Sequence, residues 1–234
     1  MAGLVRVPLA APMPRTLVFD VNETLLDLSA LDPVLERIYG AAGVREPWFA
    51  ELQRLWLVGT ATNHYEDFPT LIGHALRSVG RQRGVDLGDA DVDAVLDAVT
   101  ALPPHADVAP ALARLRDAGL RLAALTNGTL DAVRAQLAHA GLAEVFAETM
   151  SADEVQRYKP APEPYLFAAR KLDVAPGDLT LVAAHAWDVC GAHRAGLRTA
   201  FVARPGAHLV PGWPAPDVQG VDLGALADAF LGEG

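Results

Sequence analysis

The sequence contains one cysteine, no long apolar run and fewer basic than acidic residues. The single cysteine, Cys190, excludes an intramolecular disulfide and is consistent with a reducing cytoplasm. No apolar stretch is long enough to span a membrane, and none near Met1 is long enough for the core of a signal peptide. Acidic residues outnumber basic ones by 29 to 19, so the formal net charge of −10 disfavours nucleic acids and anionic membranes as partners.

The composition is otherwise that of a globular protein. Hydrophobic residues make up 51% and charged residues 21% of the 234 positions, which excludes disorder. A chain of this length can bury the core of one α/β domain, or of one domain with a sizeable insertion. Residues 1–15 are interrupted by prolines and are expected to form an N-terminal tail that leads into the first strand.

The stretch around Asp20 organises the rest of the chain. The apolar residues 16–19 run directly into this acid, and a polar turn follows. A short apolar run bounded by turn residues is typical of a buried strand in a parallel sheet. Asp20 then lies at the carboxyl end of the strand, where open α/β sheets place their ligands. An aspartate at that position is a nucleophile, a metal ligand or a loop cap.

The remaining sequence predicts a parallel sheet with a helical insertion. Residues 28–102 show helical periodicity and no clear strand, with a helix expected over 47–57 and a break over 59–65. From residue 103 onward strands alternate with helices, which implies right-handed βαβ connections. These strands are expected at 120–125, 145–150, 179–184 and 198–203.

Polar residues gather at the carboxyl ends of these strands and in the loop before the helix near residue 162. They are Asp20, Asn22, Glu23, Thr24, Thr126, Asn127, Lys159, His185 and Asp188. The carboxyl ends of parallel strands point the same way, so these side chains are expected to converge on one crevice beneath the helical insertion. Any one of them alone would be an ordinary loop residue, but together they indicate an active site.

Four segments of the chain resemble the motifs of the haloacid dehalogenase superfamily. They are a Phe-Asp-Val-x-x-Thr-Leu turn at Asp20, Thr126-Asn127-Gly128, Lys159-Pro160 and a late Asp188. The resemblance covers about residues 16 to 205. It implies that Asp20 is the nucleophile, that Thr126 binds an anionic group and that Lys159 holds the charges near the nucleophile.

The same resemblance implies the domain organisation. The fold class is α/β, with a Rossmann-like parallel-sheet core formed by residues 16–27 and 103–234. Residues 28–102 correspond to an inserted all-helical cap subdomain, which members of the superfamily place after the first motif.

Two positions argue against the phosphatase branch of the superfamily. That branch needs a second aspartate two residues after the nucleophile to protonate the leaving oxygen, and here Asn22 has no proton to give. Phosphatases also usually carry paired acids at the fourth motif to complete a magnesium shell, whereas Asp188 stands without a neighbouring acid. No metal and no cofactor are therefore expected, and the leaving group is one that needs no proton, such as halide.

The chain resembles the type II 2-haloacid dehalogenases in particular. Ala186-Trp187-Asp188-x-x-Gly191-Ala192 matches their fourth motif, and Tyr165 also matches. Many members have an asparagine where this chain has His185. Together with Glu23, this departure resembles a subgroup in which a His–Glu dyad prepares the hydrolytic water. The structural alternative for His185 is a core or loop histidine with both nitrogens satisfied.

The resemblance implies hydrolysis of short 2-haloalkanoic acids through an ester on Asp20, as in (S)-2-haloacid dehalogenases. The catalytic residues are then Asp20, Glu23, Lys159, His185 and Asp188. The substrate-binding residues are Thr24, Arg54, Thr126, Asn127, Tyr165 and Trp187. Relatives present an arginine from the cap to the halide, and Arg54 is chosen here over Arg37 and Arg45.

Two other functions stay open from the sequence. One is a magnesium-dependent small-molecule phosphatase of the same fold, and the other is a non-catalytic descendant that binds a small acid. The expected partner is a small halogenated carboxylate, with no nucleic acid and no membrane. The resemblance also allows a homodimer.

Overall fold

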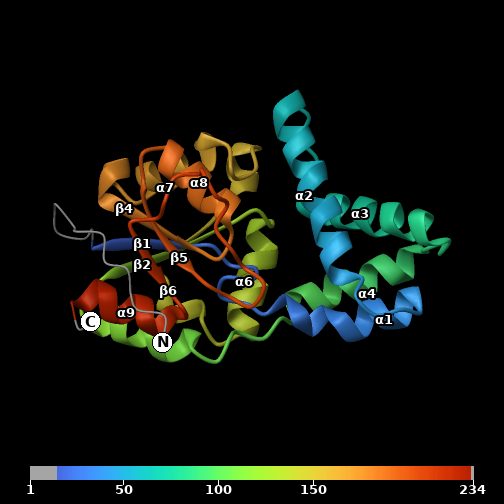
Figure 1. Ribbon diagram of the computed structural model, residues 1–234, viewed down its shortest axis with the longest axis horizontal. Helices are drawn as coiled ribbons and strands as arrows, with labels where there is room; N and C mark the ends of the chain where they lie inside the picture. Colours follow the sequence, from blue (N-terminus) through green and yellow to red (C-terminus); the bar gives the residue numbers. More distant parts are fainter. Residues whose placement is uncertain (1–14, 233–234) are drawn as a thin grey trace.

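The computed structural model describes residues 15–232 and contains a six-stranded, fully parallel sheet. The strand order is β3-β2-β1-β4-β5-β6 (Figure 1), which confirms the predicted α/β class. All of the expected N-terminal tail except Arg15 lies outside the described residues. The strands are β1 (Thr16–Phe19), β2 (Arg121–Thr126), β3 (Glu148–Ser151), β4 (Leu179–Ala183), β5 (Arg198–Val202) and β6 (Val218–Gly220).

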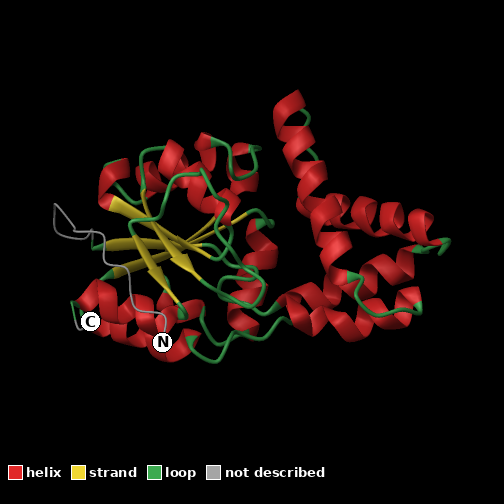
Figure 2. Ribbon diagram, in the orientation of Figure 1, coloured by secondary structure: helices red, strands yellow, loops and turns green. Residues whose placement is uncertain are grey.

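Helices cover both faces of the sheet (Figure 2), as its apolar strands require. Successive side chains of a strand point to opposite faces, so on β1 Leu17 and Phe19 enter one apolar cluster and Val18 enters the other. The first cluster includes side chains of α5 (Val108–Asp117), α6 (Leu130–His139) and α9 (Leu223–Leu231). The second includes side chains of α7 (Pro162–Lys171) and α8 (Ala186–Arg194).

Of the helices that lie between β1 and β2 in the sequence, four pack against one another beside the sheet (Figure 1). They are α1 (Asp32–Tyr39), α2 (Arg45–Thr62), α3 (Phe68–Arg83) and α4 (Asp89–Thr100). The apolar face of α3 explains this packing, because Leu71, Ile72, Ala75, Leu76 and Val79 are all buried. Among the described residues, no helix is both long and apolar enough to cross a membrane.

The structure differs from the sequence prediction along α2 and at β6. The break expected over 59–65 is present but begins later, because α2 continues through Gly59 and ends only where Asn63 adopts a left-handed conformation with φ 57°. A side chain at Gly59 would lie 2.6 Å from the carbonyl oxygen of His64, so glycine is there for close packing rather than to end the helix. The three-residue strand β6 was not predicted.

Candidate active site

The strand order brings the predicted site residues to one edge of the sheet. β1 lies between β2 and β4 in register, so the residues that follow these three strands are neighbours. The backbone N–H of Asp20 still donates to Val182 on β4, which fixes Asp20 directly beyond the end of β1. The turn that follows is closed by bonds from the N–H groups of Leu25 and Leu26 to the carbonyl of Val21.

The carboxylate of Asp20 accepts hydrogen bonds on both oxygens. The ammonium of Lys159 lies 2.8 Å from Oδ1, while the Thr24 hydroxyl lies 2.7 Å and His185 Nδ1 3.2 Å from Oδ2. The Thr24 hydroxyl is itself fixed, because it accepts from the N–H of Ala184 at 3.0 Å. Asp20 is therefore held in one orientation by groups from three separate segments of the chain.

Lys159 bridges the two aspartates of the site. Its ammonium is completely buried and also donates to Asp188 Oδ2 at 2.7 Å and to the carbonyl of Leu125 at 3.0 Å. The Tyr165 hydroxyl donates to the other oxygen of Asp188 at 2.5 Å. Tyr165 and Asp188 are both fully buried, so the structure places Tyr165 behind the site as a partner of Asp188.

The charges of this group shift its pKa values in opposite directions. Burial raises the pKa of Asp20, but the charge of Lys159 and the hydrogen bond and charge of His185 more than offset it and hold that pKa well below its usual range. Burial raises the pKa of Asp188, which Lys159 lowers only in part. Burial lowers the pKa of Lys159, but the two carboxylates outweigh it and raise that pKa. Asp20 is thus kept ionised beside a permanent cation.

His185 and Glu23 lie on two sides of the same region. The His185 ring stacks on Trp187, with centroids 5.0 Å apart, and contacts the Phe49 ring of α2 at 5.6 Å. In the described part of the chain, the Glu23 carboxylate pairs with Arg45 at 3.5 Å rather than with His185. Burial raises the pKa of Glu23, and the charges of His185 and Arg45 lower it only in part.

The Glu23 backbone has an unusual conformation. Its φ is 64°, the left-handed region that residues other than glycine seldom adopt. The neighbouring structure holds this conformation: the Glu23 N–H donates to Leu26 at 2.8 Å, and the Glu23 carbonyl contacts His105 Nε2 at 3.1 Å. Strained backbone of this kind gathers at functional sites, so the turn supports a special role for Glu23.

The residues at the end of β2 serve the site indirectly. Asn127 Oδ1 accepts from the N–H of Lys159 at 2.8 Å, and Asn127 Nδ2 donates to the carbonyl of Lys159 at 3.2 Å. Both polar groups of Asn127 therefore hold the backbone of Lys159. The Thr126 hydroxyl is buried and accepts from the N–H of Gly128 at 3.0 Å.

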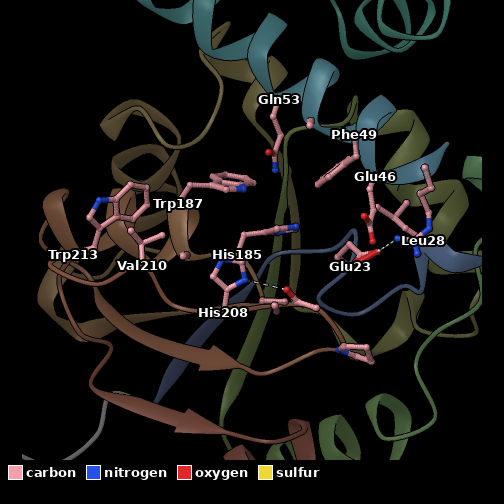
Figure 3. A pocket seen from close by; sticks show the side chains of 17 residues that line it. Glu23, Leu28, Glu46, Phe49, Gln53, His185, Trp187, His208, Val210 and Trp213 are labelled. Carbon is pink, nitrogen blue, oxygen red and sulfur yellow. Dashed lines mark hydrogen bonds and ion pairs between the residues drawn. The ribbon is translucent and has the colours of Figure 1, made fainter. Parts of the chain in front are cut away.

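A cavity of about 430 Å³ opens above His185. In Figure 3, α2 supplies Glu46, Phe49 and Gln53 from one side, and His185 faces them with Trp187 beside it. Asp20 is next to this cavity rather than in its lining: it contacts the lining residue His185 at 3.2 Å, and 7% of its side chain is exposed. The remaining described lining residues are Glu23, Leu28, Arg45, Ala50, Ala184, Ala186, Pro205, Gly206, Ala207, His208, Val210 and Trp213.

The structure does not bring the predicted Arg54 to this cavity. Arg54 has a side chain 58% exposed and pairs with Glu51 on the outer side of α2. Arg45 lines the cavity instead and is held by Asp32 at 2.9 Å as well as by Glu23. Arg54 follows Arg45 by nine residues, and at 3.6 residues per turn this puts the two side chains on nearly opposite faces of the helix.

Two arginines organise the site, of which sequence reasoning considered Arg45 without choosing it and missed Arg204. Arg45, with Phe49 and Gln53, forms a stripe at four-residue spacing on α2, a signal that was available in the sequence. The buried Arg204 donates to the carbonyl of Thr24 at 2.9 and 3.1 Å and pairs with Asp107 at 2.7 Å. Nothing in the sequence near Arg204 indicates this contact with the Asp20 turn.

The polar groups near Asp20 already have protein partners. Asn22 Oδ1 accepts from Gln136 Nε2 at 3.0 Å, so the Asn22 side chain is engaged away from Asp20. Asp20 and Asp188 already share the Lys159 ammonium. Within residues 15–232, no group of three or more His, Cys, Asp or Glu side chains is arranged to hold a metal ion.

Comparison with known proteins gives consistent matches over most of the chain. A family model described as haloacid dehalogenase-like hydrolase matches residues 14–196. The (S)-2-haloacid dehalogenase 1 of Pseudomonas sp. (strain CBS-3) is 33% identical over 81% of this chain and 85% of its own length. The (S)-2-haloacid dehalogenase of Pseudomonas sp. (strain YL) is 30% identical over 92% of this chain and 94% of its own.

A solved structure extends the similarity to three dimensions. The L-2-haloacid dehalogenase of Xanthobacter autotrophicus, with chloropropionic acid covalently bound, superposes with a TM-score of 0.88 at 26% identity. The match covers 95% of this chain and all of that protein.

Proposed function

This chain belongs to the haloacid dehalogenase-like hydrolase family, and from that membership we propose that it is a hydrolytic dehalogenase. Its substrates are short 2-haloalkanoic acids, which it converts to 2-hydroxy acids and halide. Relatives named (S)-2-haloacid dehalogenase support the S configuration of the substrate. The observation that carries the proposal is the ionised, immobilised carboxylate of Asp20, held by Lys159 and Thr24 with His185 beside it.

In the first step a carboxylate oxygen of Asp20 attacks the α-carbon of the substrate. A carbon–oxygen bond forms, the carbon–halogen bond breaks, and halide leaves with the bonding electrons and with inversion. Halide needs no proton to leave, so the amide of Asn22 suffices where a phosphatase has an acid. Lys159 contributes by helping to hold the pKa of Asp20 below its usual range, which keeps the carboxylate ionised at neutral pH.

In the second step water hydrolyses the ester on Asp20. His185 Nδ1 lies 3.2 Å from an oxygen of Asp20. Once that carboxylate is an uncharged ester, the tautomer with Nδ1 unprotonated can take a proton from a water that attacks the ester carbonyl. Glu23 faces the region of His185 and stabilises the imidazolium that forms. The charge of His185 lowers the pKa of Glu23, which supports this role. Main-chain amides of the turn after Asp20 stabilise the oxyanion. When the tetrahedral intermediate collapses, the bond between the Asp20 carbonyl carbon and the ester oxygen breaks. The imidazolium of His185 returns its proton to the departing alkoxide, which leaves as the 2-hydroxy acid, and Asp20 is regenerated.

The cavity wall provides groups for the substrate carboxylate and the halide. Arg45 is the arginine we place opposite the substrate, in the role expected for Arg54. The indole N–H of Trp187 is buried and has no hydrogen-bond partner among the described residues, which supports a contact with the departing halide. Helices α1–α4 act as the cap over the core, because α2 supplies Arg45 and Phe49 to the site.

The same proposal includes a cytoplasmic location and a homodimer. The lone Cys190 supports a reducing compartment. Light scattering of the purified protein tests the dimer.

Halide release from (S)- and (R)-2-chloropropionate, measured with EDTA present, tests the function. We expect release from the S acid that Asp20→Asn abolishes. The matched control Asp173→Asn changes an exposed aspartate in a left-handed turn, which asparagine also tolerates, and keeps full activity. Magnesium-dependent hydrolysis of a generic phosphate ester, without any halide release, would overturn the proposal in favour of a phosphatase.

A further inference from the structure

We infer that the preferred substrates are 2-haloacids with a bulky apolar substituent on the α-carbon, such as a butyl or benzyl group. The inference rests on the proposed dehalogenase activity and concerns the size and chemistry of the acid. It goes beyond the short alkanoic acids of the proposed function, because the cavity above His185 is larger and more aromatic than those acids require.

The volume of the cavity is the first observation. At about 430 Å³ it falls within the range of roughly 300–1,000 Å³ that holds drug-sized ligands. A three-carbon haloacid has only a handful of non-hydrogen atoms and would leave most of this space to water. A larger substituent would remove that water from apolar surface, which is the main source of affinity for such groups.

The chemistry of the walls is the second observation. Leu28, Phe49, Trp187, Val210 and Trp213 provide apolar surface on several sides of the cavity. The charged residues Glu23 and Arg45 form an ion pair on one side, where Glu46 also lines the cavity. A substrate can direct its carboxylate toward the guanidinium of Arg45 on that side and its substituent toward the aromatic wall.

Trp213 is the residue that defines the outer part of this wall. It lies between β5 and β6, and its side of the cavity is opposite α2 (Figure 3). Trp213 is 45% exposed, which is unusual for a tryptophan. It is one of four large hydrophobic residues that are exposed in the described chain. A substituent that covers the ring would bury this apolar surface.

The wall also has room to adapt. Val210 and Trp213 also line a second cavity of about 260 Å³, together with Ala186 and the other residues of 209–215. Close-packed walls reject added volume because neighbouring atoms cannot move. Here the wall borders a second empty space, so it can shift when a larger substituent enters.

Initial rates of bromide release from racemic 2-bromopropanoate, 2-bromohexanoate and 2-bromo-3-phenylpropanoate test the inference in the intact protein. Each methylene group that the cavity buries raises the affinity about fourfold. Binding energy that is equal in the substrate complex and in the transition state raises kcat/KM. We expect kcat/KM for the two larger acids to exceed that for 2-bromopropanoate by about tenfold or more. A ratio of one or less for both larger acids overturns the inference while the proposed function stands.

Two variants make the result specific to the wall. Trp213→Ala should lower the ratio for 2-bromo-3-phenylpropanoate by about tenfold, because the ring loses its stacking partner. Leu57→Ala alters a side chain of similar exposure, 43%, that does not line the cavity, and should leave the ratio unchanged. An equal fall in both variants, or none in Trp213→Ala, contradicts the assignment of this wall. Absence of release from all three acids overturns the proposed function and the inference together.

Discussion

Replacing Lys159 by methionine tests the charge balance at the centre of the site. The buried ammonium donates to Asp20, to Asp188 and to the carbonyl of Leu125. Methionine occupies similar space without the charge, so two buried carboxylates lose their shared cation. Removing one partner of a buried ion pair costs about 3–5 kcal/mol, which in a protein of this size lowers the melting temperature by roughly 6–20 °C.

The loss of stability caused by Lys159→Met should depend on pH, and the pKa shifts of the two carboxylates determine whether it grows or shrinks as pH rises. In the native protein the pKa of Asp20 lies below its usual range, so Asp20 stabilises the fold above its unfolded pKa of about 3.9, and this stabilisation is lost as pH falls through the folded pKa. Without Lys159, burial dominates and raises the pKa of both carboxylates. A raised carboxyl pKa destabilises the fold only above the unfolded pKa. The loss of stability in Lys159→Met is therefore largest at pH 8 and smaller at pH 5.

Urea denaturation of both proteins at pH 8 and pH 5 measures this difference. Lys171→Met is the matched control, because Lys171 also bridges two carboxylates, Glu148 and Glu154, but with a side chain 29% exposed. Exposed pairs contribute about 1 kcal/mol or less, so this control should lose little stability at either pH. A loss below about 1 kcal/mol for Lys159→Met at pH 8, or an equal loss at both pH values, would refute the reasoning.

Three further substitutions test individual roles. His185→Ala should slow ester hydrolysis and leave a covalent adduct on Asp20, which intact-protein mass spectrometry detects; normal turnover without an adduct would reject a base at this position. Arg45→Gln should raise KM by about tenfold or more, which is the effect of losing a charged contact. Arg54→Gln, on the outer face of α2, should change KM less than twofold. Steady-state kinetics in which Arg54→Gln raises KM more than Arg45→Gln would restore Arg54 as the substrate-binding arginine. Thr24→Val removes the hydroxyl that contacts Asp20 and leaves a buried N–H unpaired, so the free energy of unfolding should fall by about 1–3 kcal/mol, and an unchanged urea midpoint would contradict the contact.

The sequence alone was sufficient for the sheet and for the residues at its carboxyl edge. Apolar runs of four to six residues that end in polar side chains predict buried parallel strands, and β1, β2, β4 and β5 lie where these runs predicted them. The polar residues Asp20 and Lys159 are far apart in the chain, yet parallel topology requires that strand ends converge. Asp20 directly follows β1 and Lys159 lies in the loop between β3 and α7, and the two meet at this edge with a 2.8 Å contact.

Roles that depend on side-chain direction could not be predicted. Tyr165 and Asn127 were expected to contact the substrate, but the structure turns the first toward Asp188 and both polar groups of the second toward Lys159. A sequence motif predicts which residues lie close to one another. Which of several nearby polar groups it contacts depends on competition between hydrogen-bond partners in the packed protein.

The cavity and its arginine were decided only by tertiary structure. Helical spacing puts Arg45 and Arg54 on opposite faces of α2, but only the packing of the helix against the core determines that Arg45, Phe49 and Gln53 face His185 while Arg54 faces outward. Trp213 comes from the other end of the chain and meets them across the cavity. Local sequence determines strands and helices because their hydrogen bonds are local or repetitive. The shape of the space between them depends on contacts between segments that are distant in sequence, which no single segment specifies.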